Sequence, residues 1–272
     1  MRKPAVAGMF YPADKGSLER LVLECMKEAK KSSKSVSAYA GVCPHAGLIY
    51  SGIPAACTLI SIKELTRAET IVIAGPNHTG MGTLVSLSAD DWETPMGIFK
   101  NDVEFGNAML QGATFIKKDE LGHRFEHSIE VQLPFLSIVN PKAKIVPLCM
   151  AEQGIEAARD VADSILRAER KLGRDAVFIA SSDFSHYVSA EWAEKEDEKA
   201  LSYITKLDAE GFQKERRERD WSICGFGPIT AATLYSQEKG SKKGLELMYI
   251  NSGRASGDYS SVVAYASVAF LR

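Results

Sequence analysis

The chain has 272 residues, of which 45% are hydrophobic and 25% are charged, and its formal net charge at pH 7 is -2. This composition is ordinary for a globular protein, and so small a net charge excludes a global field that would attract nucleic acid or a membrane surface. No apolar run reaches the ~18–20 residues of a membrane helix, and no apolar leader follows Met1. Five cysteines without a CxxC pair favour a reducing compartment. We therefore expect a cytoplasmic protein with neither nucleic-acid nor membrane partners.

Short apolar runs bounded by turn residues predict the strands. The near-continuous runs TIVIA and AVFIA are typical of strands that are buried on both faces. The predicted strands, in chain order, are Tyr39–Cys43, Thr70–Ala74, Leu84–Ser88, Lys144–Leu148, Ala176–Ala180, Leu245–Asn251 and Ser261–Phe270.

Helices are predicted between these strands, where apolar residues recur at helical spacing. The alternation predicts a single α/β domain over residues 1–272, with a largely parallel sheet and helices on both faces. The connection Ser252–Ser260 is too short for a helical crossover, so the last two strands are predicted to be antiparallel and the sheet to be mixed. The predicted helices are Lys15–Lys31, Ile53–Ile62, Asp102–Gln111, Ser128–Ser137, Gly154–Leu172, two within Glu191–Asp220, and Phe226–Ser236.

Three of the five histidines come shortly after the end of a predicted strand. They are His45, His78 and His186, in the loops PHAG, GPNHTG and SSDFSHY. If the strands are parallel, these loops emerge at one edge of the sheet, where open α/β sheets bind ligands. One such histidine would be a weak indication of function, but three together predict a shared site.

Cys224 is the fourth candidate, because it directly precedes a predicted helix whose dipole favours a thiolate. The alternative is a small buried hydrophobe, an interpretation that suits the other four cysteines better. Two histidines and one anionic ligand are typical of non-haem iron sites, and imidazole with thiolate also suits zinc or copper. The residues thus predict a site for a divalent transition metal, with one histidine left free as an acid or base.

Five further residues are assigned less specific roles. Asp183, three residues before His186, either orients that imidazole or caps a turn. Four residues are assigned to the pocket wall, although Tyr11 could equally pack against the sheet. Those four are Tyr11, Tyr50, Asn77 and His127. A neighbouring carboxylate, Glu130, fits a solvated helix start or a partner for His127 one helical turn away.

Six motifs in chain order resemble the Memo family (mediator of cell motility). They are Pro4–Pro12 (PAVAGMFYP), Pro44–Gly52 (PHAGLIYSG), Gly75–Gly80 (GPNHTG), Glu126–Leu136 (EHSIEVQLPFL), Ser181–Tyr187 (SSDFSHY) and Cys224–Ile229 (CGFGPI). The family is similar in fold to class III extradiol dioxygenases, which bind Fe(II) through two His and one Glu and use another His as acid/base.

This resemblance implies roles for the candidate residues. His45 and His78 would be metal ligands, with Cys224 at the place of the carboxylate ligand, where a thiolate departs from the dioxygenase pattern. His186, with Asp183 beside it, would be the catalytic acid/base. Fe(II) is the first choice of metal, with Cu or Zn as alternatives. Prokaryotic family members often accompany radical-SAM and AMMECR-type proteins, which are the partners that the resemblance implies.

Three functions agree with this pattern. The first is a metal-dependent, dioxygenase-like oxidoreductase of unnamed substrate. The second is a non-catalytic binding protein that holds a peptide or small anionic ligand in a relic pocket. The third is a Cys–His hydrolase, which requires Cys224 and His186 within hydrogen-bond reach of each other.

Overall fold

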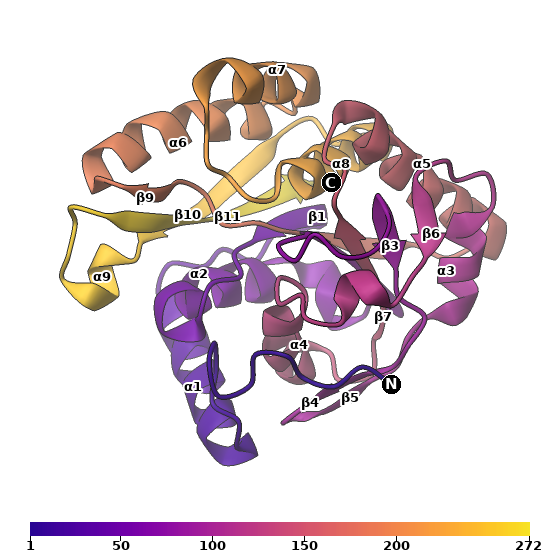
Figure 1. Cartoon of the computed structure of the whole chain (residues 1–272), viewed down its shortest axis with the longest axis horizontal. Helices are drawn as coiled ribbons and strands as arrows, with labels where there is room; N and C mark the ends of the chain where they lie inside the picture. Colours follow the sequence, from indigo (N-terminus) through magenta and orange to yellow (C-terminus); the bar gives the residue numbers. More distant parts are fainter.

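Four parallel strands form the middle of the sheet in the computed structural model, which describes residues 1–272 (Figure 1). They lie in the order β1 (Ala38–Cys43), β8 (Ala176–Ser181), β2 (Thr70–Pro76) and β7 (Lys144–Met150). Every residue of β2 and β8 is buried, as expected for strands covered on both faces. Because the strands are parallel and in register, their carboxyl ends reach the same edge of the sheet.

Antiparallel strands flank this parallel centre on both sides. On one side β11 (Val262–Leu271) pairs with β1, and it also pairs with β10 (Gly244–Asn251) and with the short β9 (His186–Val188). On the other side β3 (Val85–Leu87) is antiparallel to β7 and pairs in parallel with β6 (Ile116–Lys118). The nine-stranded sheet is therefore mixed, and the antiparallel arrangement predicted for the last two long strands is confirmed.

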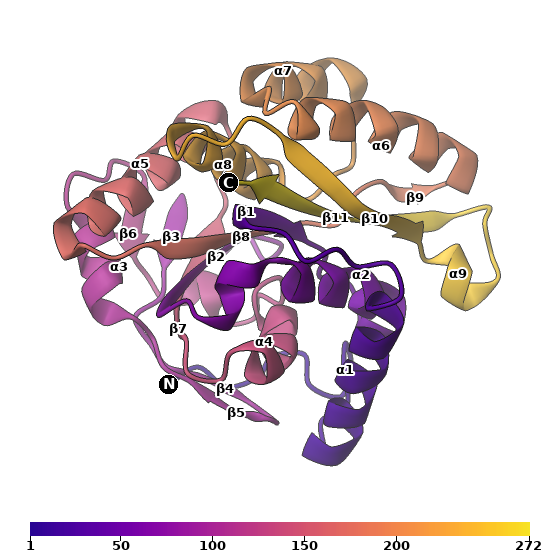
Figure 2. The same cartoon turned by 180° about the vertical axis from the view of Figure 1, so that it is seen from behind.

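Helices cover both faces of the sheet, as predicted (Figures 1 and 2). Each face has its own apolar core, and α7 packs on α6 and α8 rather than on the sheet. None of the helices combines the length and apolarity that crossing a bilayer requires. One face carries α1 (Lys15–Ala29), α2 (Leu48–Ser61) and α4 (Leu133–Val139), and the other carries α3 (Val103–Leu110), α5 (Ile155–Leu172), α6 (Ala190–Thr205), α7 (Ala209–Arg219) and α8 (Phe226–Glu238).

Several local features differ from the prediction. The helix predicted at Ser128–Ser137 is a 3-10 turn at Glu130–Gln132 followed by α4 from Leu133. The helix predicted at Ile53–Ile62 starts earlier in the structure, since α2 begins at Leu48 and contains Pro54 in its second turn. The earlier start follows from Leu48, whose N–H donates to the carbonyl of Phe10 at 2.8 Å, so the His45 loop leads directly into the helix. The short strands β6 and β9 and the hairpin of β4 (Trp92–Thr94) and β5 (Gly97–Phe99) were not predicted.

Candidate metal centre

Three histidines meet at the carboxyl edge of the central strands. His45 follows β1, His78 follows β2, and His127 lies in the loop before the 3-10 turn η3 (Glu130–Gln132). One side-chain ligand atom from each lies within 4.8 Å of the other two. Three imidazole nitrogens that share one ion at about 2.0–2.1 Å are about 3.3 Å apart. A small inward rotation of the rings would therefore let this cluster hold a metal ion.

The arrangement of the rings agrees with such a site. The ring centroids of His78 and His127 are 4.6 Å apart, and the ring of His45 stands edge-on to both at 5.2 Å and 5.5 Å. His45 is buried, His127 is partly buried, and the side chain of His78 is 33% exposed. The cluster can therefore be reached from solvent on the side of His78.

The Nδ1 atoms of two rings are engaged behind the cluster. Nδ1 of His45 lies 2.9 Å from Ser181 Oγ, and Nδ1 of His78 lies 2.9 Å from Glu126 Oε1. Partners of this kind fix the tautomer of a metal-binding histidine and leave Nε2 as the ligand atom. The polar surroundings of the cluster therefore fit a metal ion bound through Nε2.

Glu126 is a buried carboxylate that joins two of the histidines. It accepts hydrogen bonds from the backbone N–H groups of His78 at 2.6 Å, His127 at 2.8 Å and Ser128 at 2.9 Å. Burial alone would raise its pKa, but the His78 side chain and these N–H groups hold the pKa well below the usual range. Sequence reasoning did not select Glu126, and its one signal was its position directly before His127.

Burial keeps two of the imidazoles neutral near pH 7. It lowers the pKa of His45 well below its ordinary value, and the neighbouring histidines act in the same direction. It also lowers the pKa of His127 to about 4, against the opposing effect of Glu126. Neutral imidazole is the form that binds metal ions, so these two ligands need not lose a proton first.

Cys224 lies next to this cluster and contacts one of its members. Its Sγ is 3.3 Å from Nε2 of His45 and accepts the Asp183 N–H at 3.2 Å. Burial, with the Asp183 carboxylate, raises the pKa of the thiol above its ordinary value. This effect outweighs the helix dipole, so the metal-free protein lacks the favoured thiolate expected from the sequence. His127, rather than Cys224, joins His45 and His78 in the group of three.

Asp183 and His186 lie at the same site but do not contact each other as expected. The Asp183 carboxylate accepts the backbone N–H of His45 at 2.7 Å, and burial raises its pKa to about 7. Nδ1 of His186 is buried without a hydrogen-bond partner. Asp183 therefore orients the His45 loop rather than the imidazole of His186. Because Cys224 hydrogen-bonds to His45 and not to His186, the geometry also speaks against the Cys–His hydrolase.

A cleft of about 310 Å³ brings the polar groups together. Of the four residues assigned to its wall, only His127 lines it. Tyr11 is buried, and its hydroxyl donates to Glu130, while Phe10 lies on the cleft side with its ring 4.6 Å from that of His127. The lining consists of Phe10, His45, Ala46, Gly47, His78, His127, Asp183, His186, Tyr187 and Val263.

Two other residues assigned to the wall lie outside the cleft for local reasons. Asn77 turns its Oδ1 to the N–H groups of Thr79 at 3.0 Å and Gly80 at 2.9 Å, and so it shapes the loop that carries His78. Tyr50 lies in the first turn of α2 with 38% of its surface exposed, beside Gly47 of the lining but not itself part of it.

Comparison with known proteins identifies the family. Residues 2–269 match the model of the Memo-like proteins. This chain belongs to the Memo-like family. A MEMO1 family protein of Methanosarcina acetivorans is 43% identical over 269 residues, or 98% of both chains. Those of Archaeoglobus fulgidus and Methanopyrus kandleri are 42% and 40% identical, and the alignments cover at least 99% of each chain. The resemblance seen in the six motifs is therefore confirmed over the full length.

The cleft of this Memo-like protein is rich in imidazole groups and has no cationic side chain in its lining. It is lined by four histidines and one carboxylic acid, together with apolar side chains, and by no lysine or arginine. The three clustered imidazoles would hold a metal ion at this cleft, which His186 and Asp183 also line. Such a site suits a ligand that binds to the metal better than one held by cationic side chains.

Proposed function

We propose that this Memo-like protein is a metal-dependent, dioxygenase-like oxidoreductase with one divalent transition metal on His45, His78 and His127. The observation that carries the proposal is the meeting of three imidazole ligand atoms within 4.8 Å of one another. Two of the rings are neutral near pH 7, and two have their Nδ1 atoms engaged behind the site. Both features favour metal binding, because neutral, oriented imidazoles are the form that coordinates an ion.

Cys224 is proposed as an additional ligand. Nitrogen and sulfur atoms that bind one ion at about 2.1 Å and 2.3 Å are about 3.1–3.6 Å apart, for angles of about 90–110° at the ion. The observed 3.3 Å between Nε2 of His45 and Sγ of Cys224 lies in this range. Metal binding would displace the thiol proton, which burial retains in the metal-free site.

Fe(II) is the metal that we propose first, with copper or zinc as alternatives that the same donors accept. A redox-active ion would supply electron transfer and an open position for a ligand. The protein would supply the proton chemistry. The neutral imidazole of His186, which lines the cleft, can take a proton from a ligand, and the buried Asp183, with a pKa of about 7, can hold or release one near neutral pH.

The alternative of a non-catalytic relic pocket has less support in its anionic form, because no lysine or arginine lines the cleft. A peptide ligand is compatible with the apolar rim formed by Phe10 and Tyr187. Association with radical-SAM or AMMECR-type proteins stays a prediction from the family resemblance.

Metal analysis of anaerobically purified protein tests the proposal. We expect about one ion per chain in the wild type and little in the triple variant His45→Ala, His78→Ala and His127→Ala. His123→Gln is the matched control, since it removes a buried histidine outside the cluster and should retain the ion. Equal metal content in wild type and triple variant would overturn the proposal.

Spectroscopy of the Cu(II)-loaded protein addresses the thiol ligand separately. A sulfur-to-copper charge-transfer band is expected in the wild type and should be lost in Cys224→Ser while the metal content is largely retained. A spectrum that the substitution leaves unchanged would remove Cys224 from the ligand set.

A further inference from the structure

A buried ion pair lies directly behind the histidine cluster. It joins Arg2, at the start of the chain, to Glu130, and their side chains are 5% and 0% exposed. The Arg2 guanidinium also donates to the carbonyl of His123 at 2.9 Å and to the carbonyl of Glu126. It stacks at 4.1 Å on the ring of Trp92, which is fully buried. Arg2 therefore holds the chain on the N-terminal side of His127 at two points.

Glu130 holds a second segment, the N-terminal arm formed by residues 2–12. Its carboxylate accepts the backbone N–H groups of Ala5 at 2.8 Å and Val6 at 3.0 Å, together with the hydroxyl of Tyr11. All of these donors are buried or partly buried, so Glu130 is not the solvated helix start considered from the sequence. Because Arg2 belongs to the same arm, the Glu130 carboxylate joins two segments that are more than 100 residues apart in the chain.

This arrangement controls two elements of the cleft. The arm carries Phe10, whose ring lies 4.6 Å from that of His127, and the carbonyl of Phe10 accepts the N–H of Leu48 beside the His45 loop. Arg2 binds the carbonyl of Glu126 on one side of His127 and the side chain of Glu130 on the other side. The pair thus fixes both the backbone that bears His127 and the aromatic ring that packs against its imidazole.

We propose that Arg2 and Glu130 are positioning residues for the metal centre, which hold the His127 imidazole and the Phe10 wall in the geometry that lets the three histidines converge. The inference rests on the proposed metal site. A buried ion pair is a costly way to gain stability, and apolar side chains of similar volume often do as well. Its advantage here is the planar guanidinium, whose donors reach His123, Glu126 and Glu130 at the same time, which a lysine does not reproduce.

Co(II) binding to the full-length protein tests this inference, measured by competition with a chelator and by the visible spectrum of the bound ion. Arg2→Lys retains the charge but loses the planar guanidinium with its several donors. Glu130→Gln retains the shape of the side chain but loses its charge. Each should weaken Co(II) binding several-fold and alter the spectrum, which is less than the 10–100-fold of residues bonded directly to a metal ligand, because Arg2 and Glu130 act through the backbone around His127. The comparison is made at a temperature where all variants are folded.

Arg174→Lys is the matched control. Arg174 makes a similar forked pair with the buried Asp102, at 2.8 Å and 3.0 Å, between α5 and β8 and away from the histidines. This variant should lose stability but bind Co(II) as the wild type does. If it weakens binding as much as Arg2→Lys, or if Arg2→Lys and Glu130→Gln bind normally, the inference is overturned.

A milder variant covers the case in which the buried pair cannot be altered without unfolding. Phe10→Ala changes a partly exposed side chain at the far end of the arm, and it should weaken Co(II) binding several-fold with little change in stability. Normal binding by this variant would contradict a role for the arm. Failure of the wild type itself to bind Co(II) would instead refute the metal site on which the inference depends.

Discussion

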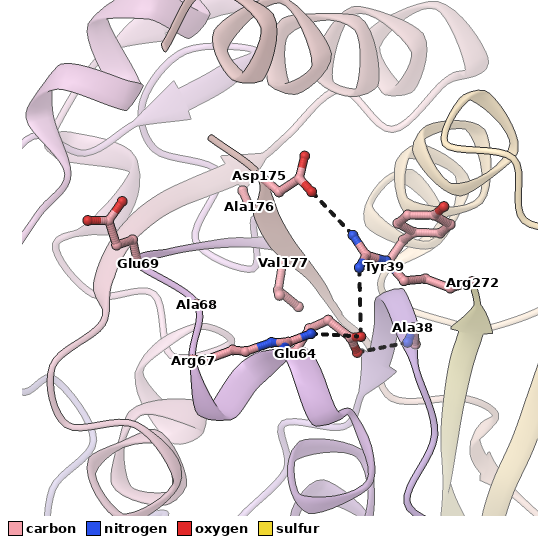
Figure 3. Close-up of a pocket in the computed structure, with 10 residues that line it drawn as sticks. All are labelled: Ala38, Tyr39, Glu64, Arg67, Ala68, Glu69, Asp175, Ala176, Val177 and Arg272. Atoms are coloured by element: carbon pink, nitrogen blue, oxygen red, sulfur yellow. Dashed lines mark hydrogen bonds and ion pairs between the residues drawn. The ribbon is translucent and has the colours of Figure 1, made fainter. Parts of the chain in front are cut away.

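The two edges of the central sheet carry clefts of similar size but different chemistry. At the amino ends of the strands, a cleft of about 290 Å³ is lined by charged side chains and by Tyr39 (Figure 3). Arg272 reaches between Asp175 at 3.2 Å and Glu64 at 3.9 Å, as Figure 3 shows, and its guanidinium lies 4.8 Å from the centre of the Tyr39 ring. At the carboxyl ends, the cleft of about 310 Å³ contains the histidine cluster.

The two clefts differ in whether their polar side chains have partners within the protein. Each charged side chain of the amino-edge cleft has an opposite charge within 4.0 Å, so its charges are already paired within the protein. At the carboxyl edge, three imidazoles face one another, and His186 Nδ1 has no partner at all. Buried polar groups are normally hydrogen-bonded, so such a cluster calls for a ligand to complete it. Cleft size alone would not have separated the two edges.

The largest effect that separates the two edges is expected from a pair of matched carboxylate substitutions. Glu126→Gln should weaken metal binding 10–100-fold, because the amide cannot accept all the donors that orient His78 and His127. Glu64→Gln, at the amino edge, removes a carboxylate that accepts Ser37 Oγ at 2.6 Å and the N–H of Ala38 at 2.9 Å. It should leave metal affinity unchanged. Calorimetric titration with Zn(II) measures both, and equal affinities for the two variants would contradict the contrast.

The parallel centre of the fold could be predicted because its signals are local. Runs such as Thr70–Ala74 and Ala176–Ala180 are apolar throughout, and their ends indicate where the loops begin. The short strand β9 could not be predicted in this way. It begins at His186 and pairs with β11 across more than 70 residues of intervening chain, so its existence depends on the tertiary structure.

The candidate site was predicted in part for the same reason. His45, His78 and His186 follow strands, so the sheet itself brings them together. His127 follows no strand, and it reaches the cluster because Glu126, its neighbour, bonds to His78. That contact, like the pair of Arg2 with Glu130, joins residues distant in sequence and has no periodic signal. Charged residues near a helix start usually lie on a solvated face, and this general rule concealed the role of Glu130.

Acid should affect the two sides of the molecule in different pH ranges. His123, beneath the arm on the metal-site side, is fully buried, and burial lowers its pKa to about 4. In the unfolded chain His123 takes up a proton near pH 6.5, whereas in the folded protein it stays neutral until about pH 4. The free energy of unfolding therefore falls as the pH drops from about 6.5 toward 4. The loss attributable to this residue is about 2 kcal/mol at pH 5.

Urea unfolding of the metal-free protein at pH 7 and pH 5 measures this loss. His123→Gln should lower the stability at pH 7 but make it less dependent on pH across this range. At the amino edge the pKa of Glu64 is lowered, because hydrogen bonds from Ser37 and Ala38 outweigh its burial. Its contribution is present above its ordinary pKa of about 4.3 and disappears only in more acidic solution. Glu64→Gln should therefore leave the change between pH 7 and pH 5 as it is in the wild type.

The smallest effect is expected from Arg272→Ala at the amino edge. The Arg272 side chain is 35% exposed and its Asp175 partner 62% exposed, so solvent and salt screen the pair. Exposed pairs of this kind contribute about 0–1 kcal/mol, which corresponds to a melting temperature lowered by at most a few degrees. The loss should shrink in high salt, and metal affinity should not change. A large, salt-independent loss of stability would show that the stacking of Arg272 on Tyr39, rather than charge pairing, holds this edge together.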